Sequence, residues 1–229
     1  MTREAFLFAL QLGDSTLPTG RFSHSYGLEA LVAQDTVNDE ETIAELVESV
    51  VLEVVAPLDG VALAEAHRLS ALRDVECLRS LDRSVTARKL TPSSRNASTS
   101  CGRRLAALSK SLTSDEICRH FAEEVGAGHS DGNLAVIEGV LAHALDIGLE
   151  QAILLELRGT SAALVSAALR MGKISALRAQ AITAASVPTL REGLEIALGL
   201  SVEEMRAAAP ELDIAAMSHT RRDARIFAT

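Results

Sequence analysis

Helical periodicity of apolar residues constrains the fold of this chain more than any other feature. Between Asp39 and Pro57, apolar side chains recur at spacings of three and four residues, which places them on one stripe of an α-helix. Proline lacks a backbone donor, so we expect Pro57 to break or kink this helix and Asp59 to cap a successor that runs to Leu72. The apolar stripe consists of Ile43, Leu46, Val47, Val50, Val51 and Val54.

Capping signals and further apolar patterns predict helices along the rest of the chain. The predicted starts are Asp74, Thr91 with Pro92, Thr113 with Glu116, and Ser201 with Glu204. Helical apolar patterns also cover residues 134–145, 154–169, 174–185 and 189–199. Strict alternation with hairpin turns is missing, and aromatic residues make up only 3% of the chain. We therefore expect an all-α fold, a single bundle-like domain over residues 1–229 with roughly nine to eleven helices, a mobile N-terminal segment and a mobile tail at about 218–229.

Charge and cysteine content restrict the class of partner. The formal net charge of -9 repels phosphate backbones, so we expect no nucleic acid and look to proteins as partners. No uninterrupted apolar run approaches the roughly 18 to 20 residues of a membrane span. The three cysteines are scattered, which fits a reducing cytoplasm; we expect Cys101 to be a small core residue.

The charge is also segregated along the chain. Residues 22–67 contain ten acidic and no basic side chains, whereas residues 68–110 contain ten basic and three acidic ones. One interpretation is that these segments pack together and neutralise each other across solvated faces. The other is that a basic face with Arg95, Arg103 and Arg104 meets an acidic partner.

A polar, glycine-rich segment at residues 10–29, LQLGDSTLPTGRFSHSYGLE, interrupts the helical patterns. It resembles the signature L-x-D-S-x-L-P-x-G-G-[FY]-[ST]-H-S-x-G-L-E of the urease accessory protein UreF family. Arg21 stands where that family usually has a second glycine, which argues against a positive φ at this site.

Three later blocks follow in the family's order. The residues from Arg95 to Leu105 resemble its R-x-A-S-x-x-x-G-R-x-L helix. Arg170 and Gln180 stand in a degraded copy of a third block. The stretch from Asp213 to Phe227 resembles the family's C-terminal block, with Thr220 in place of the usual Glu.

This resemblance implies an all-α, homodimeric, cytoplasmic and non-catalytic protein that helps nickel reach apo-urease. Its implied partners are UreD (UreH in some organisms), the GTPase UreG and apo-urease. It implies no stably bound cofactor, nickel transit through the complex, and a role in modulating GTP hydrolysis. The sequence has no nucleotide-binding P-loop, so hydrolysis must belong to a partner. The expected partner-contact residues are Pro18, Gly20, Ser23, His24, Ser25, Gly27, Glu29, Arg95, Arg104, Arg170, His219, Arg225 and Phe227.

Two alternative functions remain open. Gly13-Asp14-Ser15 resembles the nucleophile block of GDSL-type hydrolases, although Asp213 and His219 lack the D-x-x-H spacing that this chemistry needs. The other alternative is a metallochaperone that itself holds nickel, since imidazole is a good ligand for Ni²⁺. No two of the six histidines lie three or four residues apart, so we predict no metal site on a single helix.

Overall fold

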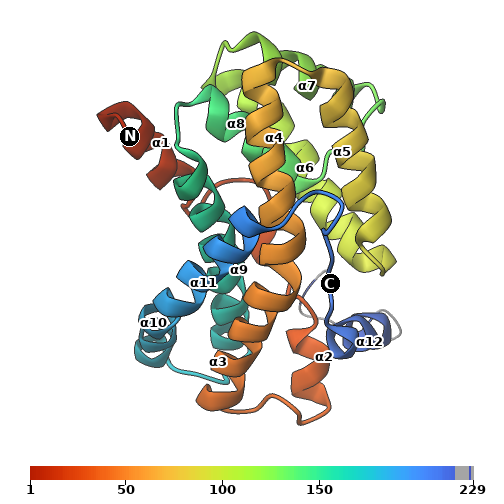
Figure 1. Ribbon diagram of the computed structural model, residues 1–229. Helices are drawn as coiled ribbons and strands as arrows, with labels where there is room; N and C mark the ends of the chain where they lie inside the picture. Colours follow the sequence, from red (N-terminus) through yellow and green to blue (C-terminus); the bar gives the residue numbers. More distant parts are fainter. Residues whose placement is uncertain (220–226, 228–229) are drawn as a thin grey trace.

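A continuous helical rod at residues 40–72 and a long second helix form the centre of the molecule (Figure 1). The computed structural model describes residues 1–219 and Phe227, without the side chains of residues 216, 218 and 219. Within these residues every regular element is helical, so the all-α fold is confirmed. The elements are α1 (Arg3–Leu12), the 3₁₀ turn η1 (Arg21–Ser23), α2 (Leu28–Ala33), α3 (Glu40–Ser49), the π-helical segment η2 (Val50–Gly60), α4 (Val61–Leu72), α5 (Val75–Arg88), α6 (Pro92–Leu112), α7 (Glu116–Gly126), α8 (Leu134–Ala144), α9 (Leu149–Arg170), α10 (Ala176–Ala185), α11 (Val187–Gly199) and α12 (Pro210–His219).

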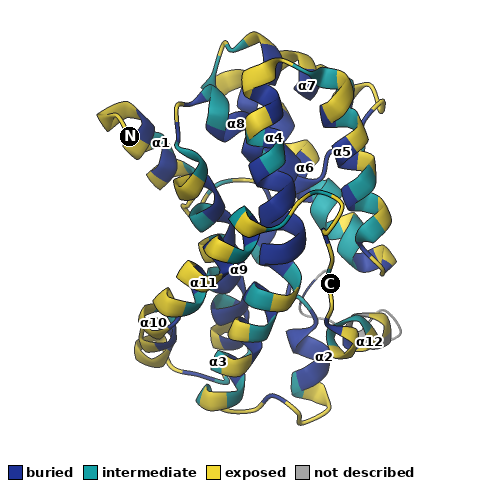
Figure 2. Ribbon diagram, in the orientation of Figure 1, coloured by how far each residue is buried: buried dark blue, intermediate teal, exposed yellow. Residues whose placement is uncertain are grey.

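The core lies where these elements cross. Helix α8 packs between α4 and α6, while α9 and α11 pack against η2. Figure 2 shows the buried residues concentrated on the inner faces of α4, α8 and α9. Among the described residues, α9 alone is long and apolar enough to span a membrane, but 61% of that apolar window is buried inside the molecule. It has the burial of a central core helix rather than of a lipid-facing one.

The expected break at Pro57 is wrong. Residues 40–72 form one rod in which η2 joins α3 to α4 without interruption, and Asp59 is buried inside it rather than capping a new helix. The wider turn of a π-helix tolerates a residue that cannot make the usual bond to the carbonyl four positions earlier. That carbonyl, on Glu53, accepts a hydrogen bond from Ala208 N at 3.0 Å.

The predicted helix at Ser201 is also wrong, although its capping bond forms. Ser201 N donates to Glu204 Oε2 at 2.9 Å, but only a turn follows. After this turn, backbone N–H groups bond to η2 instead of to the preceding turn of a helix. Arg206 N donates to Pro57 O at 3.2 Å, and Ala208 N donates to Glu53 O. Residues 201–209 therefore form an irregular strap across η2.

Most other predicted helix starts are confirmed, with one shift. Asp74 and Thr91 cap α5 and α6, and Pro92 occupies the first turn of α6. Helix α7, however, is capped by Asp115, whose side chain accepts from Cys118 N at 2.9 Å. Thr113 lies two residues too early and instead accepts from Asp115 N at 3.1 Å. The sequence pattern predicted the wrong cap because Thr113 and Asp115, both good capping residues, lie two positions apart.

Candidate functional site

The glycine-rich loop of residues 13–27 begins at the surface and enters the core from Thr19 onward, where most of its residues are buried or half-buried. Gly20 has φ +83°, and a Cβ at this position would lie 2.1 Å from Nη1 of Arg104 on α6. Arg104 Nη1 in turn donates to Thr19 O at 3.2 Å. Only glycine combines this backbone conformation with such a close approach. Gly20 and Arg104, far apart in the sequence, thus fix the loop together.

Arg21 is the most deeply placed charge of this loop. Its Nη2 donates to a carboxylate oxygen of Glu156 on α9, and the same nitrogen lies 3.3 Å from Oε1 of Glu138 on α8. Gly159 leaves room for the guanidinium, because a Cβ there would lie 2.1 Å from Arg21 Nη1. Arg21 opens the 3₁₀ turn η1 without a positive φ. The residue that replaces the usual glycine therefore contacts two carboxyl groups, the buried one of Glu156 and the half-buried one of Glu138.

The three charges shift one another's protonation. Burial lowers the pKa of Arg21, but the two glutamates raise it by more, so the guanidinium stays charged. Burial raises the pKa of Glu138 well above its usual value. Burial also acts to raise the pKa of Glu156, but Arg21 and a hydrogen bond from Glu138 lower it overall. These shifts favour the ionised form of Glu156 and the protonated form of Glu138.

A cavity of about 130 Å³ lies beside this cluster, where the loop, η2, α6, α9 and the strap meet. An ion pair borders it, because Lys89 Nζ lies 2.8 and 2.9 Å from the two carboxylate oxygens of Asp59. The hydroxyl of Thr160, buried in its wall, has no hydrogen-bond partner among the described residues. The wall is mostly apolar, but these polar groups and the volume allow the space to hold water. The lining residues on the loop and the strap include His24, Tyr26, Gly27, Ala207 and Ala209.

Cys101 in the cavity wall is a core residue, as predicted. It is buried, and burial raises the pKa of its thiol to about 11. A neutral thiol is a poor nucleophile. His24, in the same wall, has its pKa lowered by burial and by the nearby charge of Arg104. Neither group therefore supplies the charged form that nucleophilic catalysis or phosphate binding would use here.

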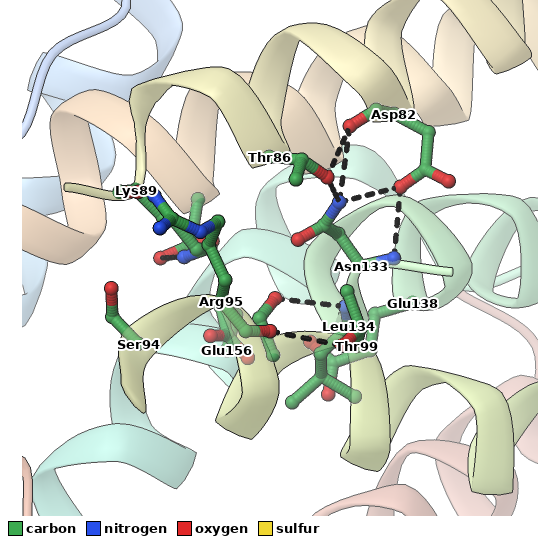
Figure 3. A network of polar contacts seen from close by, with 12 residues as sticks. Asp82, Thr86, Lys89, Ser94, Arg95, Thr99, Asn133, Leu134, Glu138 and Glu156 are labelled. Carbon is green, nitrogen blue, oxygen red and sulfur yellow. Dashed lines mark hydrogen bonds and ion pairs between the residues drawn. The ribbon is translucent and has the colours of Figure 1, made fainter. Parts of the chain in front are cut away.

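A second polar network fixes the start of α8, and with it Glu138. The buried carboxylate of Asp82 on α5 accepts from the hydroxyl of Ser130 at 2.6 Å, from Gly132 N at 2.7 Å and from Asn133 N at 2.8 Å. Asn133 Nδ2 adds a bond to the same carboxylate at 2.8 Å. Figure 3 shows Asp82 and Asn133 facing each other beside Thr86. The carboxylate of Asp82 therefore binds three successive parts of the loop before α8, at Ser130, Gly132 and Asn133.

The two chain ends meet at a third cluster, which we call the chain-end contact. Arg170, at the end of α9, donates through Nη2 to the carbonyl of Phe22, and its Cζ lies 4.4 Å from the ring centroid of Phe227. Phe227 N donates to Glu29 Oε2 at 3.0 Å, and the Phe227 ring is buried. Arg170 itself is exposed. The structure thus brings together four residues from three separate sequence blocks.

The remaining predicted contact residues divide into buried and exposed ones. Pro18 and Ser23 are exposed, and Ser23 Oγ donates to Gly20 O at 2.7 Å. Arg95 is half-buried and donates through Nη1 to Lys89 O at 2.6 Å. The side chain of His219 and all of Arg225 lie outside the described residues. Within this one chain His24, Ser25, Gly27 and Glu29 are buried.

The structure bears on the first interpretation of the charge segregation, the packing of the acidic segment against the basic one. The acidic and basic segments meet directly at the buried Asp59–Lys89 pair. Arg103 and Arg104, by contrast, donate to the carbonyls of Asp131 and Thr19. Neither of these arginines pairs with a carboxylate of the described residues. Their positive charge on α6 is therefore uncompensated.

The region around Ser15 does not have hydrolase geometry. A GDSL-type nucleophile needs a strand-to-helix turn, and the described part of the chain contains no strand. Asp14 Oδ1 accepts from Thr16 N and from Thr16 Oγ1, both at 2.7 Å, which makes an ordinary surface turn. Ser15 is exposed in this turn. The resemblance to the GDSL-type nucleophile block is therefore confined to the three residues Gly13-Asp14-Ser15.

Comparison with known proteins gives matches over most of the chain. The UreF family profile matches residues 37–187. The chain belongs to the UreF family. It is 33% identical over 221 residues to urease accessory protein UreF 2 of Brucella suis biovar 1, covering 96% of this chain and 90% of that protein. It is 32% identical over 225 residues to UreF of Kocuria rhizophila, covering 95% and 94%, and 28% identical over 222 residues to UreF of Trichodesmium erythraeum, covering 97% and 96%.

Sequence reasoning missed the charged core of this UreF protein. Lys89, Glu138 and Glu156 belong to no motif that the sequence singled out, Asp59 was expected only as a helix cap, and Arg21 was noted only as a departure. A signal was present, because Glu138 in LAVIEGVL and Glu156 in AILLELRG interrupt otherwise apolar helical stretches. A lone carboxylate on such a face requires a buried partner. The identity of that partner could not be read from spacing, since Arg21 lies more than a hundred residues from either glutamate in the sequence.

Proposed function

We propose that this chain is a non-catalytic scaffold of urease maturation that binds UreD (UreH) and the GTPase UreG, so that nickel can reach apo-urease. Membership of the UreF family and the naming of its relatives as urease accessory proteins support this role. We further propose that it works in the cytoplasm as a homodimer, that nickel passes through the complex without a resident cofactor in this chain, and that docking modulates GTP hydrolysis.

The chain-end contact is the observation that carries this proposal. It presents Arg170 at the surface beside Phe22 of the signature loop and Phe227 of the C-terminal block. Exposed arginines next to aromatic rings are typical anchors of protein interfaces. One partner docking here would contact three blocks that are otherwise far apart in the sequence. Arg170 is in a position to meet the phosphate charge of a GTPase or its acidic rim.

Replacing Arg170 with Ala is expected to weaken recruitment of UreG and lower urease activation, with little change in stability. The side chain is exposed and its contact with Phe227 contributes about 1 kcal/mol, so the fold should survive. UreG co-purification, GTP turnover and urease activity in cells measure the effect.

The matched control is Arg178→Ala, which removes another exposed arginine, on α10, paired with Glu40 at 3.3 Å. This variant should behave like the wild type. Unchanged UreG recruitment, GTP turnover and urease activation in Arg170→Ala would contradict the role of Arg170.

Deleting residues 218–229 is expected to abolish pull-down of UreD. The deletion removes Phe227, whose buried ring contacts Arg170, and Arg225. Phe227→Leu in the full chain serves as the finer variant, because it keeps an apolar side chain but removes the ring. It should retain folding, measured by thermal melting, and reduce UreD binding. Undiminished UreD capture by the truncated chain would refute the docking role of this end.

A further inference from the structure

The structure brings together two histidines that the sequence keeps apart. His67 on α4 and His143 on α8 have ring centroids 5.2 Å apart, with their planes at 84°. The two helices cross closely just before this point, since a Cβ on Gly139 would lie 2.8 Å from Cβ of Ala66. His143 follows Gly139 by one helical turn, and His67 follows Ala66 directly. The pair therefore stands on two rigid, tightly packed helices rather than on loops.

One hydrogen bond fixes the tautomer of His67. Its Nε2 lies 3.0 Å from the carbonyl oxygen of Ile147. A carbonyl can only accept, so Nε2 carries the hydrogen and Nδ1 keeps its lone pair. A backbone carbonyl on the second ring nitrogen is the usual arrangement around a metal-binding histidine.

We propose that His67 and His143 form a two-ligand site for a first-row divalent metal ion of the type that imidazole prefers, Ni²⁺, Cu²⁺ or Zn²⁺. Metal–nitrogen bonds of about 2.0 Å and a near-tetrahedral angle place two ligating imidazole centroids about 5 Å apart. The observed separation of 5.2 Å is close to this value, with the two rings meeting edge to face at 84°. Binding would need only side-chain rotation, with no movement of α4 relative to α8.

The two histidines do not fill the coordination sphere of a metal ion by themselves. No group of three His, Cys, Asp or Glu side chains suited to a metal is found among the described residues. Water or a partner's side chain must therefore fill the other coordination positions. Two protein ligands give weak, rapidly exchanging binding, which suits handing an ion on rather than storing it. This inference stands on the two histidines and does not depend on the proposed docking to UreD or UreG.

The test is titration of the untagged, full-length chain with NiCl₂ by isothermal calorimetry. We expect the wild type to bind one ion per chain at this site, and His143→Phe to lower the affinity at least about ten-fold. His67→Ala should do the same. Electron paramagnetic resonance of the Cu²⁺ form should show two coupled imidazole nitrogens, reduced to one in either variant.

The matched control is His120→Ala, which removes an exposed histidine of α7 and should leave binding unchanged. Circular dichroism melting establishes that each variant folds, and His143→Asn replaces His143→Phe should the larger ring perturb packing. Wild-type Ni²⁺ affinity and an unchanged copper spectrum in the folded His143 variant would overturn the proposal. Failure of UreG or UreD binding would not affect this result, because no partner is present in the titration.

Discussion

Glu156→Gln is expected to lower the free energy of unfolding by about 3–5 kcal/mol, because it leaves the buried guanidinium of Arg21 without its main counter-charge. The remaining carboxyl, Glu138, has its pKa raised by burial and is a poor replacement. For a chain of this size the loss corresponds to a fall of roughly 6–20 °C in melting temperature. Urea unfolding at pH 7.5 and thermal melting measure it.

Glu138→Gln is the matched control, and it should have a much smaller effect. Glutamine resembles the protonated carboxyl that the folded state favours, so we expect a change within about 1 kcal/mol. Equal destabilisation by the two variants would contradict the assignment of the charge to Glu156.

The pH dependence separates the two residues further. The pKa of Glu138 is raised on folding, so the folded chain keeps a proton that the unfolded chain releases, and this contribution to stability is lost as pH rises towards the folded pKa. The pKa of Glu156 is lowered, so its contribution is present above the unfolded value and lost as pH falls through the folded one. Glu138→Gln should therefore flatten the alkaline side of the stability profile, and Glu156→Gln the acidic side.

Asp82→Ala is expected to cost about 3 kcal/mol or more, because it leaves several buried donors unsatisfied at once. The carboxylate binds the hydroxyl of Ser130, two successive backbone N–H groups and the amide of Asn133. Figure 3 shows the bonds to Asn133. We also expect faster amide hydrogen exchange at residues 130–134, since Asp82 accepts the backbone N–H groups of Gly132 and Asn133. Urea unfolding and exchange measured by mass spectrometry report the two effects.

Asp39→Ala provides the comparison. Asp39 also accepts a backbone bond, from Thr42 N at 2.9 Å, but it is an exposed cap at the start of α3. Its loss should cost about 1 kcal/mol and leave exchange at residues 130–134 unchanged. An Asp82→Ala variant no less stable than Asp39→Ala would show that water or backbone rearrangement satisfies the loop.

Local sequence patterns determined the helices and several of their ends. The apolar stripe from Ile43 to Val54 lies on one rod as expected, and Asp74 and Thr91 cap the helices that their spacing indicated. These signals are local, because a helical face and an N-cap depend on residues within one or two turns. The family motifs likewise pointed to residues 10–29 and to Arg170.

The tertiary structure alone decided which distant residues meet. Pro57 stays inside a helix because the strap of residues 201–209 bonds the carbonyls of η2, and the same bonding prevents a helix after Ser201. Arg21 pairs with Glu156 across more than a hundred residues, and His67 meets His143 only because α4 crosses α8 at Gly139. Long-range pairing of charges and rings is set by how helices cross, and a helical period carries no information on the partner of its buried face.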